Sequence, residues 1–363
     1  MALISDYLTE KGHIPFAELP FNEVDNYIVT KIVNPDYRRI LAPEGEAVPL
    51  GETLEAYFAL YGGEGNFQGV LASPSIIAAL RRLRSLPRYR DLLLSGYVHR
   101  ILPAQTEQFS ALTVTLPGSW SYISFRGTDD TLLGWKENFL MSVGPVEAQA
   151  DAAAYLASAA ERLTDPLMVG GHSKGGNLAV YAAAMSPPEV QEQILRVYNN
   201  DGPGFLPDFY QEPGYLRIRP RLLTLLPQNT LVGTLLTREK WASIVKSTRW
   251  GPAAHDGFTW EVRDTAFVRC PNLSRSSRAF EETMDRVLAT MDRDQRREFT
   301  DELFDALAAA GAGTVTEVSE QTLSQALEIA GSFRKGTGTK RFVLEVLREL
   351  LLSYTRQRLG LEN

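Results

Sequence analysis

The sequence predicts an α/β protein with a mainly parallel sheet, helices on both faces of that sheet, a helical N-terminal region and a helical C-terminal extension. Three observations lead to this expectation. Between residues 148 and 228, short apolar strand patterns alternate with helical patterns, as in parallel sheets built from crossover helices. Residues 1–95 and 274–363 mostly carry apolar residues at helical spacing. Hydrophobic residues make up 44% of the chain and charged residues 22%, which is typical of a folded globular protein.

The first 95 residues are expected to be mainly helical. Ile76, Leu80 and Leu83 fall on one helical stripe within residues 73–94, and Pro87 is expected to break this helix into two pieces. Beyond residue 96 the pattern changes to short runs of β-branched and aromatic residues separated by turn formers. Three strands are predicted there, over residues 96–102, 109–116 and 120–127.

The middle of the chain supplies the alternating pattern. An alanine-rich helix is followed by a short apolar run of the buried-strand type and then by a second helix. The predicted helices cover residues 148–162 and 177–185, the predicted strands cover 166–171, 194–200 and 221–228, and a strand pair is predicted over 258–270.

The C-terminal part of the chain shows three helical stripes and no strong strand. The stripes run from Phe280 to Met291, from Phe299 to Leu307 and from Phe342 to Leu350, and the segment 335–340 is expected to be a loop. We therefore expect one domain over residues 1–273, with 1–95 as its helical N-terminal part, and a C-terminal helical extension over residues 274–363.

The composition argues against several classes of protein. Lys and Arg number 37 against 44 Asp and Glu, so the chain lacks the basic excess typical of nucleic-acid binders. One cysteine, Cys270, and four histidines are too few for a structural Cys/His zinc site. The sequence contains no metal or cofactor motif, so no cofactor is expected. Because it also lacks a signal-peptide core and a long apolar run, a cytoplasmic protein without a transmembrane segment is expected.

The strongest local pattern is a G-x-S-x-G sequence, residues 171–175, between an apolar strand and a helix of small residues. A serine on so sharp a strand-to-helix turn has a strained backbone, and the flanking glycines remove Cβ clashes. The turn lifts the serine hydroxyl above the sheet and aims the free N–H groups of the helix at the same point. Ser173 is therefore a candidate nucleophile. The alternative is an ordinary tight turn with a capping serine.

A second segment offers donors for an oxyanion. Gly127 gives a turn at the carboxyl end of a strand, where ligands bind in open α/β sheets, and Thr128 then offers an N–H group and a hydroxyl. We expect the N–H groups of Thr128 and Lys174 to form an oxyanion hole, with an ordinary capped turn as the alternative. The Lys174 side chain is expected to form an ion pair, with attraction of an anionic substrate as the alternative.

Several sequence segments resemble those of two known families. FRGT at 125–128, followed by a tryptophan-containing helix and by GHSKGGNLA at 171–179, is similar to the class 3 lipases among the α/β hydrolases. Residues 6–32, NNDGPGF and LPQNTLVGTLL resemble the Mbeg1-like family, over a stretch from residue 4 to past residue 310. This resemblance implies a lipase-like α/β-hydrolase fold with a serine nucleophile.

The scarcity of histidine leaves one candidate base. In this fold the triad follows the order Ser, then Asp or Glu, then His. His13, His99 and His172 precede Ser173, and only His255 follows it. His255 is therefore the candidate base, with an ordinary loop histidine as the alternative.

We call the strand-to-helix turn that carries Ser173 the elbow. The candidate acid is Asp201, which follows the first strand after this elbow. Class 3 lipases carry their acid one strand later, where this sequence has Gln228 and Asn229 and no carboxylate. An amide can orient an imidazole but cannot stabilise an imidazolium as a charge does. Asn229 and Gln228 are therefore candidate orienting or substrate-contacting residues, and Asp256 is a weaker candidate acid because it adjoins His255.

Together these residues predict a serine hydrolase that cleaves a carboxylic ester through Ser173, His255, Asp201 and an acyl-enzyme. The expected partner is a small-molecule substrate, either a lipid or acyl ester or a thioester. The rival hypothesis is a catalytically inactive hydrolase-fold protein that binds a protein partner through its C-terminal helices, and the missing class 3 acid favours it.

Overall fold

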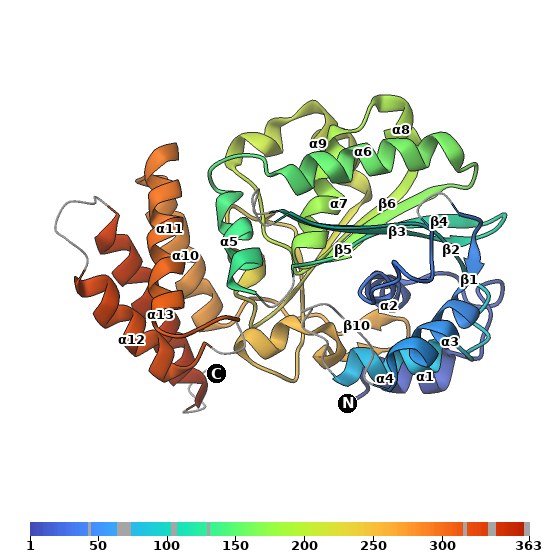
Figure 1. Ribbon diagram of the computed structural model, residues 1–363, viewed down its shortest axis with the longest axis horizontal. Helices are drawn as coiled ribbons and strands as arrows, with labels where there is room; N and C mark the ends of the chain where they lie inside the picture. Colours follow the sequence, from blue (N-terminus) through green and yellow to red (C-terminus); the bar gives the residue numbers. More distant parts are fainter. Residues whose placement is uncertain are drawn as a thin grey trace.

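The computed structural model describes residues 1–42, 45–63, 74–102, 107–128, 131–314, 318–332 and 339–358. These residues build an eight-stranded sheet whose spatial order follows the chain order (Figure 1). The first four strands pair antiparallel and the last five pair parallel, with β4 belonging to both sets. The strands are β1 (Val48–Pro49), β2 (Leu93–Leu102), β3 (Glu107–Leu116), β4 (Trp120–Phe125), β5 (Leu167–His172), β6 (Ile194–Asn200), β7 (Leu222–Pro227) and β8 (Ser243–Val245).

The sequential order of the parallel strands decides which face their connecting helices cover. Crossovers between parallel strands are right-handed, so a sheet that always adds its next strand on the same side keeps all crossover helices on one face. That face carries α6 (Glu147–Arg162), α7 (Lys174–Met185), α8 (Pro188–Gln193) and α9 (Pro213–Ile218), which lie together above the sheet in Figure 1.

The N-terminal region covers the opposite face of the sheet. It contains α1 (Ile4–Lys11), α2 (Glu23–Ile32), α3 (Leu50–Tyr61) and α4 (Pro74–Leu83), which lie below the strands in Figure 1. Tyr122 and Met168 pack into the core on this side, whereas their neighbours Ile123 and Val169 pack against α6 and α7. Burial of both faces explains why the parallel strands read as continuous apolar runs. The predicted α/β class, with helices on both faces, is confirmed.

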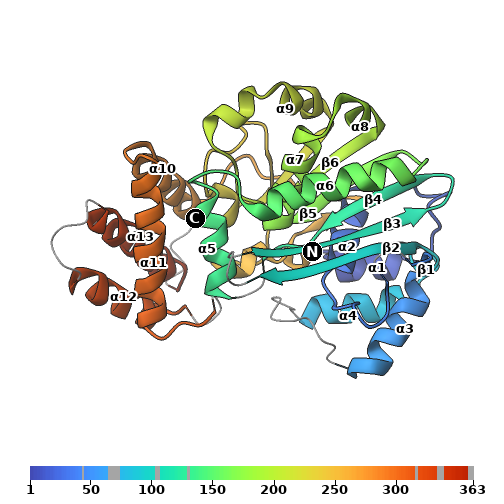
Figure 2. The ribbon, with the colours of Figure 1, turned by 45° about the horizontal axis from the view of Figure 1, so that its top comes forward.

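A group of C-terminal helices stands beside the sheet, next to α5 (Leu132–Leu140), as Figure 2 shows. These helices are α10 (Arg275–Ala289), α11 (Arg293–Ala309), α12 (Glu320–Ser332) and α13 (Lys340–Arg358). They share a hydrophobic core of their own, to which Leu132, Leu235 and Leu236 of the sheet-bearing part also belong. The predicted helical C-terminal extension is confirmed. The boundary at residues 273 and 274 stays a prediction, and most of the loop predicted over 335–340 lies outside the described residues.

The strand pair predicted over 258–270 is much shorter than expected. It consists of β9 (Val262–Arg263) and β10 (Ala266–Phe267), because the residues before it form two short 3-10 helices, η5 (Gly251–His255) and η6 (Gly257–Thr259).

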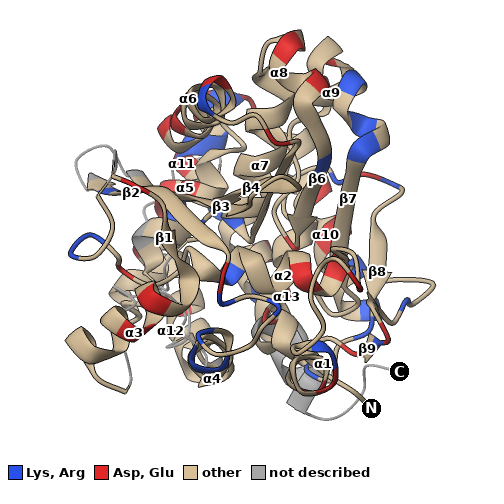
Figure 3. Ribbon diagram, turned by 90° about the vertical axis from the view of Figure 1, so that its right-hand side faces the viewer, with Lys and Arg blue, Asp and Glu red and all other residues tan. Residues whose placement is uncertain are grey.

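Within the described part of the chain, no helix has both the length and the apolar character needed to cross a membrane. Figure 3 colours the ribbon by residue type and shows basic positions on α4 and acidic positions on α3 and α8.

Candidate active site

Ser173 lies on the sharp turn between β5 and α7. Its φ of 60° and ψ of −135° put it in a region that side-chain-bearing residues rarely adopt, at a cost of about 1–3 kcal/mol. The backbone of α7 begins very close to the end of β4. A Cβ on Gly175 would lie 2.1 Å from the Phe125 carbonyl oxygen. Only glycine fits there, so the G-x-S-x-G spacing follows from the packing of α7 against β4 and β5.

Asp201 and His255 meet at the same carboxyl edge of the sheet. Asp201 follows β6 directly, has a φ of 52° and is fully buried. The His255 Nδ1–H group donates to Asp201 Oδ2 over 2.6 Å, and the Thr230 hydroxyl donates to Asp201 Oδ1 over 2.5 Å. Neighbouring parallel strands end at one edge of a sheet, which is why the residues after β5 and β6 come together.

Two contacts from other elements support the loop that carries His255. The Gly257 N–H donates to the Tyr27 hydroxyl over 2.7 Å, and a Cβ on Gly257 would lie 2.2 Å from the Tyr27 ring. The His172 Nε2–H group donates to the His255 carbonyl oxygen over 2.7 Å. A carbonyl can only accept, so this bond requires a proton on His172 Nε2. Burial, followed by the charges of Lys31 and His255, holds the pKa of His172 well below its ordinary value, so that its ring is neutral.

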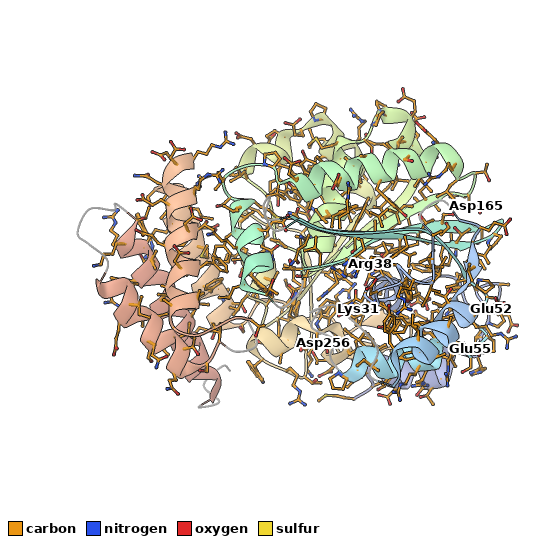
Figure 4. The ribbon with its side chains drawn as sticks, in the orientation of Figure 1. Lys31, Arg38, Glu52, Glu55, Asp165 and Asp256 are labelled. Carbon is orange, nitrogen blue, oxygen red and sulfur yellow. The ribbon has the colours of Figure 1, made fainter. Side chains whose placement is uncertain are left out.

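Lys31 of α2 is a buried amine beneath this loop. Burial lowers its pKa from 10.5 to about 7, and the Asp256 carboxylate partly opposes that shift. Figure 4 shows both residues on the N-terminal side of the sheet. The Lys31 Nζ atom lies 4.8 Å from the centre of the Tyr27 ring.

No hydrogen bond joins Ser173 and His255 in the described part of the chain, although the His255 ring lies with its centre 4.2 Å from that of His172, the residue before the serine. Ser173 is 4% exposed. Catalytic hydrogen bonds are often long or misaligned in unliganded enzymes and form fully only with substrate, so this geometry is compatible with a Ser–His pair.

The two candidate oxyanion donors also lie at this edge. A Cβ on Gly127 would lie 3.0 Å from the Ser173 Cβ, which places Thr128 beside the elbow. Lys174 is the first residue of α7, so its N–H has no helical carbonyl to bond. Its side chain points into the protein, where Nζ lies 2.6 Å from Glu137 Oε2 and is not exposed. The predicted ion pair is therefore present, and the ammonium group is buried inside the protein.

The remaining candidates contact other parts of the protein. The Asn229 Nδ2 group donates to the Arg249 carbonyl over 3.0 Å, and its buried Oδ1 has no hydrogen-bond partner among the residues that the structure describes. Gln228 Oε1 accepts from the Cys270 thiol over 2.8 Å. Asp256 caps η6 by accepting from the Phe258 N–H. The imidazole of His255 is thus bonded by a carboxylate and not by an amide of the 228–229 pair.

Three contacts near the site were not predicted from the sequence. Thr230 bonds the candidate acid, Glu137 pairs with Lys174, and the Asn138 Oδ1 accepts from the Thr128 hydroxyl over 3.1 Å. The position of these residues along the chain is the only local signal for them. Thr230 follows β7, and Glu137 and Asn138 lie on α5, the helix after the turn that carries Thr128. In the part of the chain that the structure describes, no group of three or more His, Cys, Asp or Glu side chains is arranged to hold a metal ion.

More than half of the chain matches a known protein family. The sequence model of the family described as Mbeg1-like matches residues 83–305. Among solved structures, the chain is similar to the crystal structure of M37 lipase, with 13% identity and a TM-score of 0.34, over 58% of this chain and 78% of that one. No curated protein matches it.

Proposed function

Because the chain belongs to the Mbeg1-like family and has an α/β-hydrolase fold, we propose that it is a serine hydrolase that cleaves carboxylic esters. The observation that carries this proposal is the bond between His255 Nδ1 and Asp201 Oδ2, made at the sheet edge where Ser173 occupies a strained elbow. A base oriented by a carboxylate beside a serine on such a turn is the arrangement that activates a hydroxyl for acyl transfer.

The proposed reaction has two halves. The Ser173 Oγ attacks the ester carbonyl carbon while its proton passes to His255 Nε2, and Asp201 stabilises the imidazolium that results. The N–H groups of Lys174 and Thr128 donate to the tetrahedral oxyanion. Collapse of this intermediate expels the alcohol, which takes the proton from Nε2. Water then attacks the acyl-enzyme with His255 as base, which releases the carboxylic acid and restores Ser173.

Two observations support an uncharged acyl substrate. The ammonium group next to the nucleophile is neutralised inside the protein by Glu137, so it offers no attraction to an anion. The Trp135 ring centre lies 6.3 Å from that of His255, and Trp135 packs with Leu235 and Leu236 in the apolar core shared with the C-terminal helices. The partly buried Trp135 would give an acyl chain an apolar neighbour beside His255.

Covalent labelling of the full chain with a fluorophosphonate tests the proposal. We expect mass spectrometry to find one adduct on Ser173, which is lost in Ser173→Ala and strongly slowed in His255→Ala. Ser186→Ala, at the far end of α7, and His13→Ala, at an exposed position, are matched controls that should label like the unaltered chain. A folded protein that is not labelled would refute the hydrolase and favour a hydrolase-fold binding protein.

A further inference from the structure

A buried ion pair fixes the residue that follows the nucleophile. The Lys174 Nζ lies 2.6 Å from Glu137 Oε2, and its other bond goes to the Gln108 carbonyl oxygen, also at 2.6 Å. The side chains of Lys174 and Glu137 are 0% and 3% exposed. Buried charges are tolerated only when paired, and removing one partner leaves an uncompensated charge. Any displacement of Glu137 would therefore pull on Lys174, whose N–H is a proposed oxyanion donor.

The next residue of the same helix contacts the second proposed donor. Asn138 is fully buried, and its Oδ1 accepts a hydrogen bond from the Thr128 hydroxyl over 3.1 Å. This bond fixes the Thr128 side chain and, through it, the direction of the backbone at the turn after β4. Two consecutive residues of α5 thus contact the two residues whose N–H groups are the proposed oxyanion donors.

The opposite side of α5 packs on the C-terminal helices. Lys136 pairs with Asp301 of α11 at 2.6 Å, and the Phe139 ring centre lies 5.2 Å from that of Phe304. The Leu132 N–H also donates to the Gly313 carbonyl oxygen over 3.1 Å. As Figure 2 shows, α5 stands between the edge of the sheet and these helices. The helix is therefore held from both sides, which is the rigidity that a preorganised oxyanion hole needs.

From this arrangement we infer that α5 is the positioning element of the oxyanion hole, with Glu137 acting through Lys174 and Asn138 acting through Thr128. The inference rests on the proposed serine hydrolase and adds to it two residues that touch no substrate. Both act only on the placement of N–H donors, so they affect the tetrahedral state more than the bound ester.

The test compares Glu137→Gln and Asn138→Leu with the unaltered chain on p-nitrophenyl butyrate, with rates expressed per serine titrated by a fluorophosphonate. Removing an oxyanion donor lowers kcat about 100- to 1,000-fold, and displacing one should lower it about tenfold or more. KM should stay within about twofold, because substrate binding is not the contact removed. The Ki of a trifluoromethyl ketone, whose adduct with Ser173 carries the same oxyanion, should rise by the factor by which kcat/KM falls.

Asp301→Asn is the matched control, because it also converts the carboxylate of an ion pair that involves α5 into an amide, but on the outer side of the helix. It should leave kcat and the Ki unchanged. Thr128→Val removes only the hydroxyl and keeps the N–H, so it should reproduce Asn138→Leu, and the double variant should lose no more than either single one. This pair keeps the test sharp if Glu137→Gln fails to fold.

The outcomes separate the two proposals. Absence of labelling at Ser173 in the folded, unaltered chain would refute the hydrolase itself. Normal labelling and hydrolysis, combined with an unchanged kcat in Asn138→Leu and Thr128→Val, would refute the role of α5 alone. A fall in kcat without a matching rise in the Ki of the ketone would also overturn the role of α5, since the donors would then not be what the variants disturb.

Discussion

Replacement of the Asp201 carboxylate by an amide is the sharpest perturbation that the site offers. Asp201 is fully buried and has two hydrogen-bond donors, His255 Nδ1 at 2.6 Å and the Thr230 hydroxyl at 2.5 Å. Asp201→Asn keeps the size of the side chain, but it removes the negative charge and can present an NH₂ group to the imidazole. His255 Nδ1 then faces an amide donor where its N–H group needs an acceptor. This favours the tautomer of His255 that has no proton on Nδ1.

The size of the effect follows from the charge pair that forms during the reaction. When His255 takes the serine proton, an imidazolium lies against the carboxylate at hydrogen-bond distance. Two unit charges about 4 Å apart interact by about 4 kcal/mol at an effective dielectric constant of about 20, which corresponds to about a thousandfold in rate. The same replacement in serine proteases lowers kcat about 10,000-fold. We expect a loss of kcat between these two values.

The assay is hydrolysis of p-nitrophenyl butyrate, with the folded fraction checked by circular dichroism and thermal unfolding. Asp256→Asn is the control, because that carboxylate adjoins His255 in sequence but caps η6 through the Phe258 N–H. It should cost less than about tenfold in kcat, since it bonds no part of the imidazole. A folded Asp201→Asn with kcat near that of the unaltered chain, or an equal loss in Asp256→Asn, would refute the assignment of the acid.

Three further predictions concern stability and the support of the site. Thr230→Val removes a hydrogen bond to the charged carboxylate, a type that contributes about 1.5–3 kcal/mol, so kcat should fall about 10- to 100-fold in the ester assay. Gly257→Ala would bring a Cβ to 2.2 Å from the Tyr27 ring, so Tm and kcat should both fall, whereas Gly331→Ala, where a Cβ meets nothing within 4 Å, should leave Tm unchanged or raise it. Burial lowers the pKa of Lys31 to about 7, so between pH 7 and 10.5 the unfolded chain binds a proton that the folded chain lacks, and stability rises with pH across this window. Lys31→Met should therefore gain most in urea unfolding at pH 7 and little at pH 10; a gain that is constant with pH would contradict this origin.

The middle strands were predictable because each is a buried apolar run bounded by turn formers. The expected strand over 194–200 coincides with β6, and that over 221–228 differs from β7 only at its ends. The edge strands β1 and β8 are two and three residues long, too short to carry a pattern. Helix α12 was not predicted, because its buried face includes the alanines Ala326 and Ala330. Alanine gives only a weak apolar stripe.

The site was predictable as far as it depends on local backbone. Ser173 could be found because the elbow needs glycines at fixed spacing, and His255 because only one histidine follows it. The partner of Lys174 could not be found, since Glu137 is 37 positions away and faces it only once α5 has docked. The catalytic roles of these residues stay predictions, whereas their mutual distances are observations.

The bond between Tyr27 and Gly257 has a consequence for how the molecule is assembled. It joins residues 230 positions apart, and Asn26, beside Tyr27, reaches 174 positions ahead to Asn200 of β6. Contacts of such separation close large loops and form slowly. During synthesis, α2 must therefore wait for most of the chain before the support of the His255 loop exists. Tyr27 also lies outside the stretch 83–305 that matches the family, so a piece of chain limited to that stretch would lack the support that Tyr27 gives to the His255 loop.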